Sequence, residues 1–255
     1  MVALARFECQ SCGGNLINIM SNATLETTVG EWVRAVPARA RVFENLGIDF
    51  CCGGKKPLGE VCARRGLDPQ TVVAMLHALD GSLDPTSVDV AGLSLSELCD
   101  HIERYHHDWL REELPRLDFM TEKVARVHGD GEPRLYEIRE VFESFATELV
   151  SHTQEEESVI FPMIRKLEAD GTGTSLRETA LREVLTKLET EHERAGAALE
   201  RFSWLTDGYT PPEWACNTFR ALYDTLQRLE RNMHQHVHKE NNILFPSALA
   251  LTAAE

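Results

Sequence analysis

The chain has 255 residues, of which 43% are hydrophobic, so it can bury the core of one medium domain and one small one. Its net charge of −15 argues against a nucleic-acid partner. The sequence contains no apolar run of about eighteen residues, so we predict no membrane span. Seven cysteines, an odd number, argue against a disulfide scaffold. Because the N-terminus is also too short and polar for a secretory signal, we predict a cytoplasmic protein.

Residues 1–24 contain the sequence CQSC and show little periodicity, so we expect a poorly ordered N-terminal extension. Two hypotheses stay open for it. Either translation starts naturally at Met20, or Cys9 and Cys12 are half of a zinc ribbon, which needs two further ligands. Residues 25–85 are predicted to form a small domain of short helices around LGIDFCCGGKKPLGE, followed by a linker over residues 80–92.

Residues 93–250 contain four long helical patterns, separated by the Gly- and Pro-rich sequences HGDGEP, EADGTGTS and TDGYTPP. The first pattern opens with SLSE, from Ser94 to Glu97, which is the signature of a helix capping box. No alternating strand pattern of useful length is present. We therefore predict an all-α protein, in which a small helical domain precedes an up-down-up-down four-helix bundle.

Each of the four patterns places one histidine in its apolar stripe when the stripe is followed in steps of three and four residues. The second and fourth stripes also contain a glutamate, four residues after the histidine. Glu155 and Glu157 lie about 100° to either side of Glu156 and therefore leave the stripe. The six residues that this count selects are His106, His152, Glu156, His192, His236 and Glu240.

The selected residues occur in a repeated arrangement. HTQEEESVIFP and HVHKENNILFP share a His, a Glu four residues later, and a Phe-Pro pair, and the 46 residues from His106 to His152 nearly equal the 44 from His192 to His236. A single core histidine is usually just hydrogen-bonded, but buried carboxylates cost several kcal/mol unless they are paired or bind metal. Four nitrogens and two oxygens suit two first-row cations with open positions for small ligands, so we predict a dinuclear metal site.

The sequences RYHHDWLREELPRL, SHTQEEESVIFPMI, ETEHERAGAAL and HVHKENNILFP resemble the hemerythrin-like bundle of the iron–sulfur cluster repair proteins, the YtfE, ScdA and DnrN group. LGIDFCCGGKKPLGEVCARRGLD resembles their small N-terminal domain, and the likeness extends from about Thr28 to Leu249. The resemblance implies two iron ions, bridged by oxo and carboxylate groups, with the six selected residues as ligands and Glu156 and Glu240 as bridges. It also implies repair of clusters damaged by nitric oxide or oxidative stress, with damaged iron–sulfur proteins as clients and iron as the species delivered.

The family's cysteine pair falls on Cys51 and Cys52, to which we assign a catalytic role. Because adjacent cysteines bond to each other only with strain, three hypotheses stay open: a reactive thiol pair, soft ligands for a passing metal, or buried residues in a small turn. Lys55, Lys56 and a helix starting near Pro57 are expected to lower the pKa of the thiols.

Further side chains are expected around the predicted centre. His77, His101, His107 and His128 are predicted at the surface or behind the ligands, Tyr105 as a hydrogen-bond partner of a ligand, and Glu191 beside an access path.

Two alternative functions stay open, a hemerythrin-like dioxygen or redox sensor and a di-iron oxidoreductase that converts nitrogen oxides. The CCGG segment argues against the sensor, and steady turnover of nitric oxide or nitrite would favour the oxidoreductase. The acidic surface permits a homodimer, and neither the clients nor the electron donor can be inferred from the sequence.

Overall fold

The computed structural model describes residues 24–80, 90, 92–171 and 175–252. The predicted extension up to residue 23, including Cys9 and Cys12, lies outside the described residues, as does most of the predicted linker. Within the described residues the structure consists of helices, turns and one isolated antiparallel bridge between Thr28 and Pro57. This confirms the predicted all-α class.

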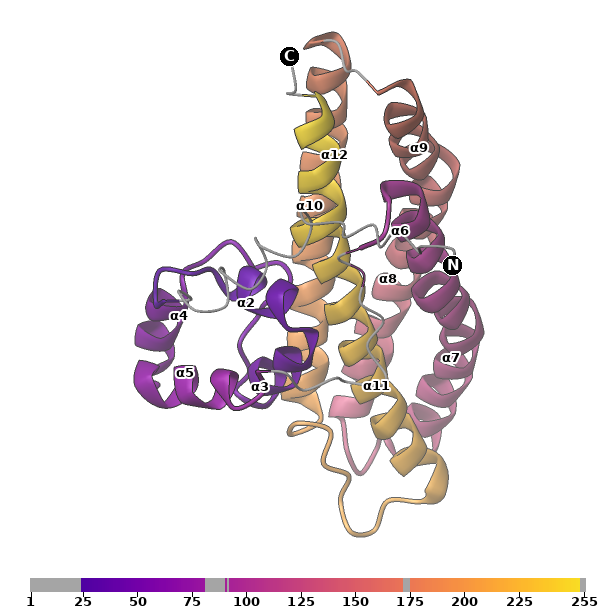
Figure 1. Ribbon diagram of the computed structural model, residues 1–255. Coiled ribbons are helices and arrows are strands. Elements are labelled where there is room, and N and C mark those ends of the chain that lie inside the picture. Colours follow the sequence, from indigo (N-terminus) through magenta and orange to yellow (C-terminus); the bar gives the residue numbers. More distant parts are fainter. Residues whose placement is uncertain (1–23, 81–89, 91, 172–174, 253–255) are drawn as a thin grey trace, which may run out of the picture.

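A small helical domain comes first and lies to one side of the long helices, at the left in Figure 1. Its helices are α2 (Val29–Ala35), the 3-10 helix η1 (Pro37–Arg39), α3 (Ala40–Asn45), α4 (Leu58–Arg65) and α5 (Pro69–His77). Helix α2 starts with a capping box, in which the Thr28 side chain accepts from the Glu31 N–H and the Glu31 carboxylate accepts from the Thr28 N–H. The domain has its own apolar core, built around Trp32, Phe43, Phe50, Leu58 and Leu76.

Four long helical segments form the bundle (Figure 1). The first comprises α6 (Leu95–Ile102), η2 (Glu103–His107) and α7 (Asp108–His128), and the second comprises α8 (Arg134–Glu155), η3 (Glu156–Ile160) and α9 (Phe161–Asp170). The third is the single helix α10 (Ser175–Leu205). The fourth comprises α11 (Asn217–Lys239), η4 (Glu240–Leu244) and α12 (Phe245–Thr252). The predicted capping box at Ser94 and Glu97 is present at the start of α6.

The elements η2, η3 and η4 are π-helices, which interrupt three of the four segments. A π-turn accommodates one extra residue, so the side chains after it return to the core one position later than α-helical periodicity predicts. The third segment, α10, has no such interruption among its described residues. The π-turns therefore shift the register of three helices at the same level of the bundle.

Two separate apolar clusters fill the bundle, one above and one below this level. The first cluster includes Leu110, Phe142, Leu199 and Leu226. The second includes Ile102, Ile160, Leu188 and Leu244. Every helical segment passes from one cluster to the other near its predicted metal ligand, so the polar residues lie in a layer between two apolar cores.

The small domain packs against the third and fourth segments through the loop that contains the cysteine pair. Asn242 of η4 donates from its side-chain amide to the carbonyl of Cys51, at 3.1 Å. Gly54 leaves room for this contact, because a Cβ there would lie 2.4 Å from Asn242 Oδ1 and 2.7 Å from the Phe50 carbonyl oxygen. Lys55 of this loop forms an ion pair with Glu189 of α10, at 2.7 Å. The loop is thus attached to the same two segments that carry His192 and Glu240.

Among the described residues, no helix combines the length and apolar character needed to cross a membrane.

Candidate metal centre

The polar layer of the bundle brings four imidazoles and two carboxylates together. The carboxylates belong to Glu156 and Glu240, each the first residue of a π-turn, and both side chains are fully buried. Two groups of four possible ligands share them. One group adds His107 and His236 to the two glutamates, and the other adds His152 and His192.

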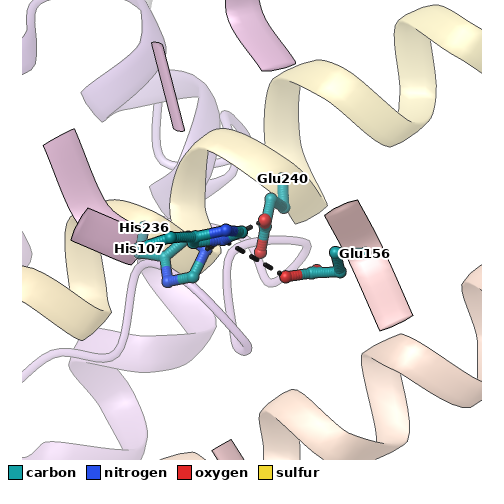
Figure 2. A group of neighbouring side chains, drawn as sticks. All are labelled: His107, Glu156, His236 and Glu240. Atoms are coloured by element: carbon teal, nitrogen blue, oxygen red, sulfur yellow. Dashed lines mark hydrogen bonds and ion pairs between the residues drawn. The ribbon is translucent and has the colours of Figure 1, made fainter. Parts of the chain in front are cut away.

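The first group is shown in Figure 2, where both glutamates point toward the two imidazoles. The Nε2 atoms of His107 and His236 are 3.1 Å apart. His107 Nε2 lies 3.4 Å from Glu156 Oε2, and His236 Nε2 lies 3.0 Å from Glu240 Oε1.

The second group uses the other oxygen of each carboxylate. The Nε2 atoms of His152 and His192 are 3.0 Å apart. His152 Nε2 lies 3.2 Å from Glu156 Oε1, and His192 Nε2 lies 3.3 Å from Glu240 Oε2. Each glutamate therefore presents one oxygen to one pair of histidines and the second oxygen to the other pair, as two bridging carboxylates would.

These separations fit cation binding. Two ligand atoms about 2.1 Å from a common ion lie about 3.0 Å apart at neighbouring octahedral positions and about 3.4 Å apart at tetrahedral ones. The contacts between atoms within each group span the same range. Both oxygens of Glu156 and Oε2 of Glu240 are buried without a hydrogen-bond partner. A pair of cations would satisfy all three oxygens, so the donor set fits two metal ions.

Hydrogen bonds to the outer ring nitrogens orient three of the four histidines. His107 Nδ1 lies 2.7 Å from Glu157 Oε1, and His152 Nδ1 lies 2.8 Å from Glu191 Oε2. His192 Nδ1 lies 2.9 Å from Asn241 Oδ1. An oxygen acceptor at Nδ1 favours the tautomer whose free lone pair is on Nε2, the atom that faces the carboxylates. Glu191, which was predicted beside an access path, thus also contacts His152.

Burial and the charges of neighbouring side chains act in opposite directions on the ionisable groups of this layer. Burial favours the neutral ring of His152, but the carboxylates of Glu156, Glu240 and Glu191 together outweigh burial and raise the pKa of His152 to about 10. Burial also opposes ionisation of Glu156 and Glu240, yet the facing histidines lower the pKa of both carboxyls. The pKa of His236 falls well below its usual value because of burial and the neighbouring His107.

The structure brings His107, rather than the predicted His106, next to the two glutamates. His106 is also buried, but its Nε2 lies 2.8 Å from Lys239 Nζ and its Nδ1 lies 3.1 Å from Asn232 Oδ1. The cause is the π-turn that ends at His107. Counting forward from Ile102 in α-helical steps reaches His106, whereas counting back from the buried Leu110 reaches His107. The two counts differ by one residue, and this difference is the feature of the sequence that indicates a break in the α-helical register.

The structure also places the residues that were predicted to lie at the surface or around the ligands. His107 was expected at the surface or behind the ligands, and instead faces both glutamates. His101 is buried and lies 2.9 Å from Lys239 Nζ, next to His106 rather than in the centre. His77 is exposed and pairs with Asp80. Tyr105, expected to support a ligand, is 52% exposed and packs against His101.

A cavity of about 510 Å³ lies between α8 and α10. It is lined by His152 and His192 and by charged side chains that include Glu155, Lys187, Glu191 and Arg194. The cavity lining also contains apolar side chains, including Phe145 and Leu149. The cavity therefore borders the second histidine pair of the centre.

The cysteine pair lies beside the centre without joining it. Cys51 is buried and Cys52 partly buried, and the Cys52 thiol donates to the backbone carbonyl of His192 at 3.3 Å. The expected lowering of the thiol pKa is wrong for Cys51. The neighbouring Cys52, burial and the Asp49 carboxylate raise its pKa well above the usual value. Lys55, expected to act on the thiols, forms its ion pair with Glu189 instead.

The fold and this layer together define a class, the helical bundles that bind metal through inward-facing histidines and glutamates. The sequence comparisons agree. A family described as "Hemerythrin HHE cation binding domain" matches residues 100–248, and ScdA_N, described as "Domain of Unknown function (DUF542)", matches residues 25–80.

Three similar proteins carry the name of one function. The "Iron-sulfur cluster repair protein YtfE" of Musicola paradisiaca is 37% identical over 227 residues, 88% of this chain and 96% of that protein. The protein of the same name from Escherichia coli O17:K52:H18 is 35% identical over 222 residues, 87% of this chain and 96% of the relative. The "Iron-sulfur cluster repair protein ScdA" of Staphylococcus haemolyticus is 32% identical over 222 residues, 87% and 97% of the two chains. This chain belongs to the family of hemerythrin-like iron–sulfur cluster repair proteins with an N-terminal ScdA_N domain.

Proposed function

We propose that this chain is a cytoplasmic, non-haem di-iron protein that repairs iron–sulfur clusters damaged by nitric oxide or oxidative stress, by donating iron to them. The observation that carries this proposal is the pair of carboxylates shared between two pairs of histidines. The names of the relatives support the repair function. Damaged iron–sulfur proteins would be the clients.

Each histidine pair has a defined part in holding the metal. His107 and His236 would bind one iron, His152 and His192 the other, and each glutamate would give one oxygen to each ion. The residues supply only six side chains, and even two bridging carboxylates leave two six-coordinate ions with open positions. Bound iron would supply a redox-active Lewis acid together with a store of metal that can be exchanged.

The outer partners of the histidines decide how firmly the metal is held. Glu157, Glu191 and Asn241 accept hydrogen bonds from the ring nitrogens that face away from the centre, which keeps the rings aligned and strengthens them as ligands. Glu191 is also part of the cavity wall, so a molecule that enters the cavity can disturb the hydrogen bond to His152. This second histidine pair is therefore the side from which small ligands would reach the iron and from which iron would leave.

Recovery of a damaged enzyme tests the proposal. A hydratase with a [4Fe–4S] cluster is inactivated with nitric oxide, freed of small molecules and mixed with the iron-loaded protein. We expect its activity to return, and a Glu156→Gln variant to be inactive in the assay because it loses iron. Glu155→Gln is the matched control for iron content, since Glu155 lies one residue away and forms its ion pair with Lys187 outside the centre. Equal recovery with the metal-free protein would contradict iron donation. Continuous consumption of nitric oxide without recovery of the hydratase would instead support the oxidoreductase alternative.

A further inference from the structure

Outside the bundle centre, the loop before α4 gathers a second group of possible metal ligands. Asp49, Cys51 and Cys52 each offer one ligand atom, and these three atoms lie within 4.8 Å of one another. The Cys51 sulfur is 3.1 Å from Asp49 Oδ1 and 3.9 Å from the Cys52 sulfur. None of these residues contacts the carboxylates of Glu156 or Glu240 through a side-chain bond found in the structure. The group is thus separate from the centre.

The distance between the two sulfurs distinguishes the possible roles of the pair. In a disulfide the sulfurs are about 2.05 Å apart, and Cys51 and Cys52 are both free thiols. Two thiolates bound to one tetrahedral ion at about 2.3 Å lie about 3.8 Å apart. The observed 3.9 Å matches the second arrangement. The thiols are therefore already spaced as ligands of one cation.

The loop holds the Asp49 carboxylate in place for such an ion. Its Oδ1 accepts from the Cys51 N–H at 2.9 Å, and its Oδ2 accepts from the Gly53 N–H at 2.7 Å. Gly53 allows this close approach, because a Cβ there would lie 2.9 Å from the Asp49 carbonyl oxygen. Outer hydrogen bonds that fix a ligand carboxylate are a regular feature of metal sites.

The donor types of the group suit a soft or borderline cation, because two cysteine sulfurs and one carboxylate oxygen face one another. The nearest lysine of the loop, Lys55, is paired with Glu189 on α10. A divalent ion would stabilise two thiolates and a carboxylate together, which a distant surface lysine does not do.

We propose that Asp49, Cys51 and Cys52 form a further metal site, which takes one soft or borderline divalent cation such as ferrous iron or zinc. Three protein ligands leave a fourth tetrahedral position open, as in sites that exchange a ligand. The site lies against α10, where the Cys52 thiol reaches the His192 carbonyl and its sulfur would be 3.5 Å from a Cβ at Gly196. One part of this inference rests on the proposed function, namely that the site receives iron from the bundle centre and passes it to a client protein.

Cobalt(II) is a suitable probe, because thiolate ligands give it an intense near-ultraviolet charge-transfer band that the nitrogen and oxygen ligands of the bundle centre do not give. Cobalt is titrated into the full chain after its bundle centre has been loaded with iron. We expect about one cobalt per chain to bind with this band, and the variants Cys51→Ser and Cys52→Ser to lose it. Asp49→Asn is expected to keep the band but to bind cobalt at least about tenfold more weakly.

Two control variants separate this site from other thiols. Cys216→Ser changes an exposed cysteine at the start of α11, and a double Cys9→Ser, Cys12→Ser variant removes the CQSC pair; both are expected to keep the band. Circular dichroism and iron content identify any variant that has lost its fold. The inference is overturned if the wild type gives no thiolate band, if the band disappears with the CQSC pair, or if Asp49→Asn binds as tightly as wild type. Because the experiment measures binding alone, failure of cluster repair would leave its result unchanged.

Discussion

Replacing His107 with alanine removes a proposed ligand from the first histidine pair. The lost Nε2 lies 3.1 Å from His236 Nε2 and 3.4 Å from Glu156 Oε2. Loss of an outer hydrogen-bond partner already lowers metal affinity about 10–100-fold, so loss of a ligand should lower it by more than about 100-fold. This corresponds to more than about 2.7 kcal/mol. We therefore expect His107→Ala to be isolated with about half of the wild-type iron or less.

His106→Ala is the matched control, since the two histidines are adjacent and both are buried. It removes the ring that contacts Lys239 and Asn232, which leaves the partly buried amine of Lys239 with one fewer acceptor. We expect the variant to keep its iron and to lose about 1–3 kcal/mol of folding stability.

Iron per chain after gel filtration and urea unfolding of the metal-free proteins distinguish the two variants. Loss of iron in His106→Ala with full retention in His107→Ala would refute the reasoning, because it would mean that the π-turn at residues 103–107 is not present in solution. The uninterrupted helical count would then be right.

Three further predictions follow from other parts of the structure. Glu156→Gln should lower the iron content well below that of Glu155→Gln, as measured by elemental analysis, because Glu156, unlike Glu155, faces both histidine pairs; equal losses would contradict the bridging position. Gly54→Ala should destabilise the docked small domain by about 1–3 kcal/mol, because its Cβ would lie 2.4 Å from the Asn242 side chain. Faster limited proteolysis would reveal this change, and unchanged cleavage would argue against the docking. Burial raises the pKa of Glu230 from 4.5 to about 7, so its ionisation opposes folding increasingly as pH rises through that window. Glu230→Gln should therefore raise the thermal midpoint of the metal-free protein at pH 8 but not at pH 4; an equal change at both would exclude titration as the cause.

Most of the fold could be predicted from local sequence signals. Apolar residues repeat with the period of a helix over long stretches, and Gly- and Pro-rich sequences separate them, which locates the bundle's helices and turns. The capping box at Ser94 and Glu97 was also predictable, since it depends only on residues three positions apart. The predicted role of the CQSC pair lies outside the described residues and stays a prediction.

Five of the six predicted ligands lie in the centre because their helices keep α-helical register up to the ligand. His152 and His236 come before the π-turns of their helices, and His192 lies on an uninterrupted one. His107 comes at the end of a π-turn, where a count of 3.6 residues per turn is wrong by one residue. Helical periodicity does not predict the side chains that accept hydrogen bonds from the histidine Nδ1 atoms. Asn241 meets His192 across 49 positions of sequence, a contact that only the packing of two helices brings about.

The central claim is that four buried imidazoles and two buried carboxylates hold two metal ions, and the metal content of the purified full chain tests it most directly. Elemental mass spectrometry, after a mild chelator has removed weakly held metal, should find about two irons per chain. Less than one metal ion of any kind per chain, in protein shown to be folded, would contradict the claim.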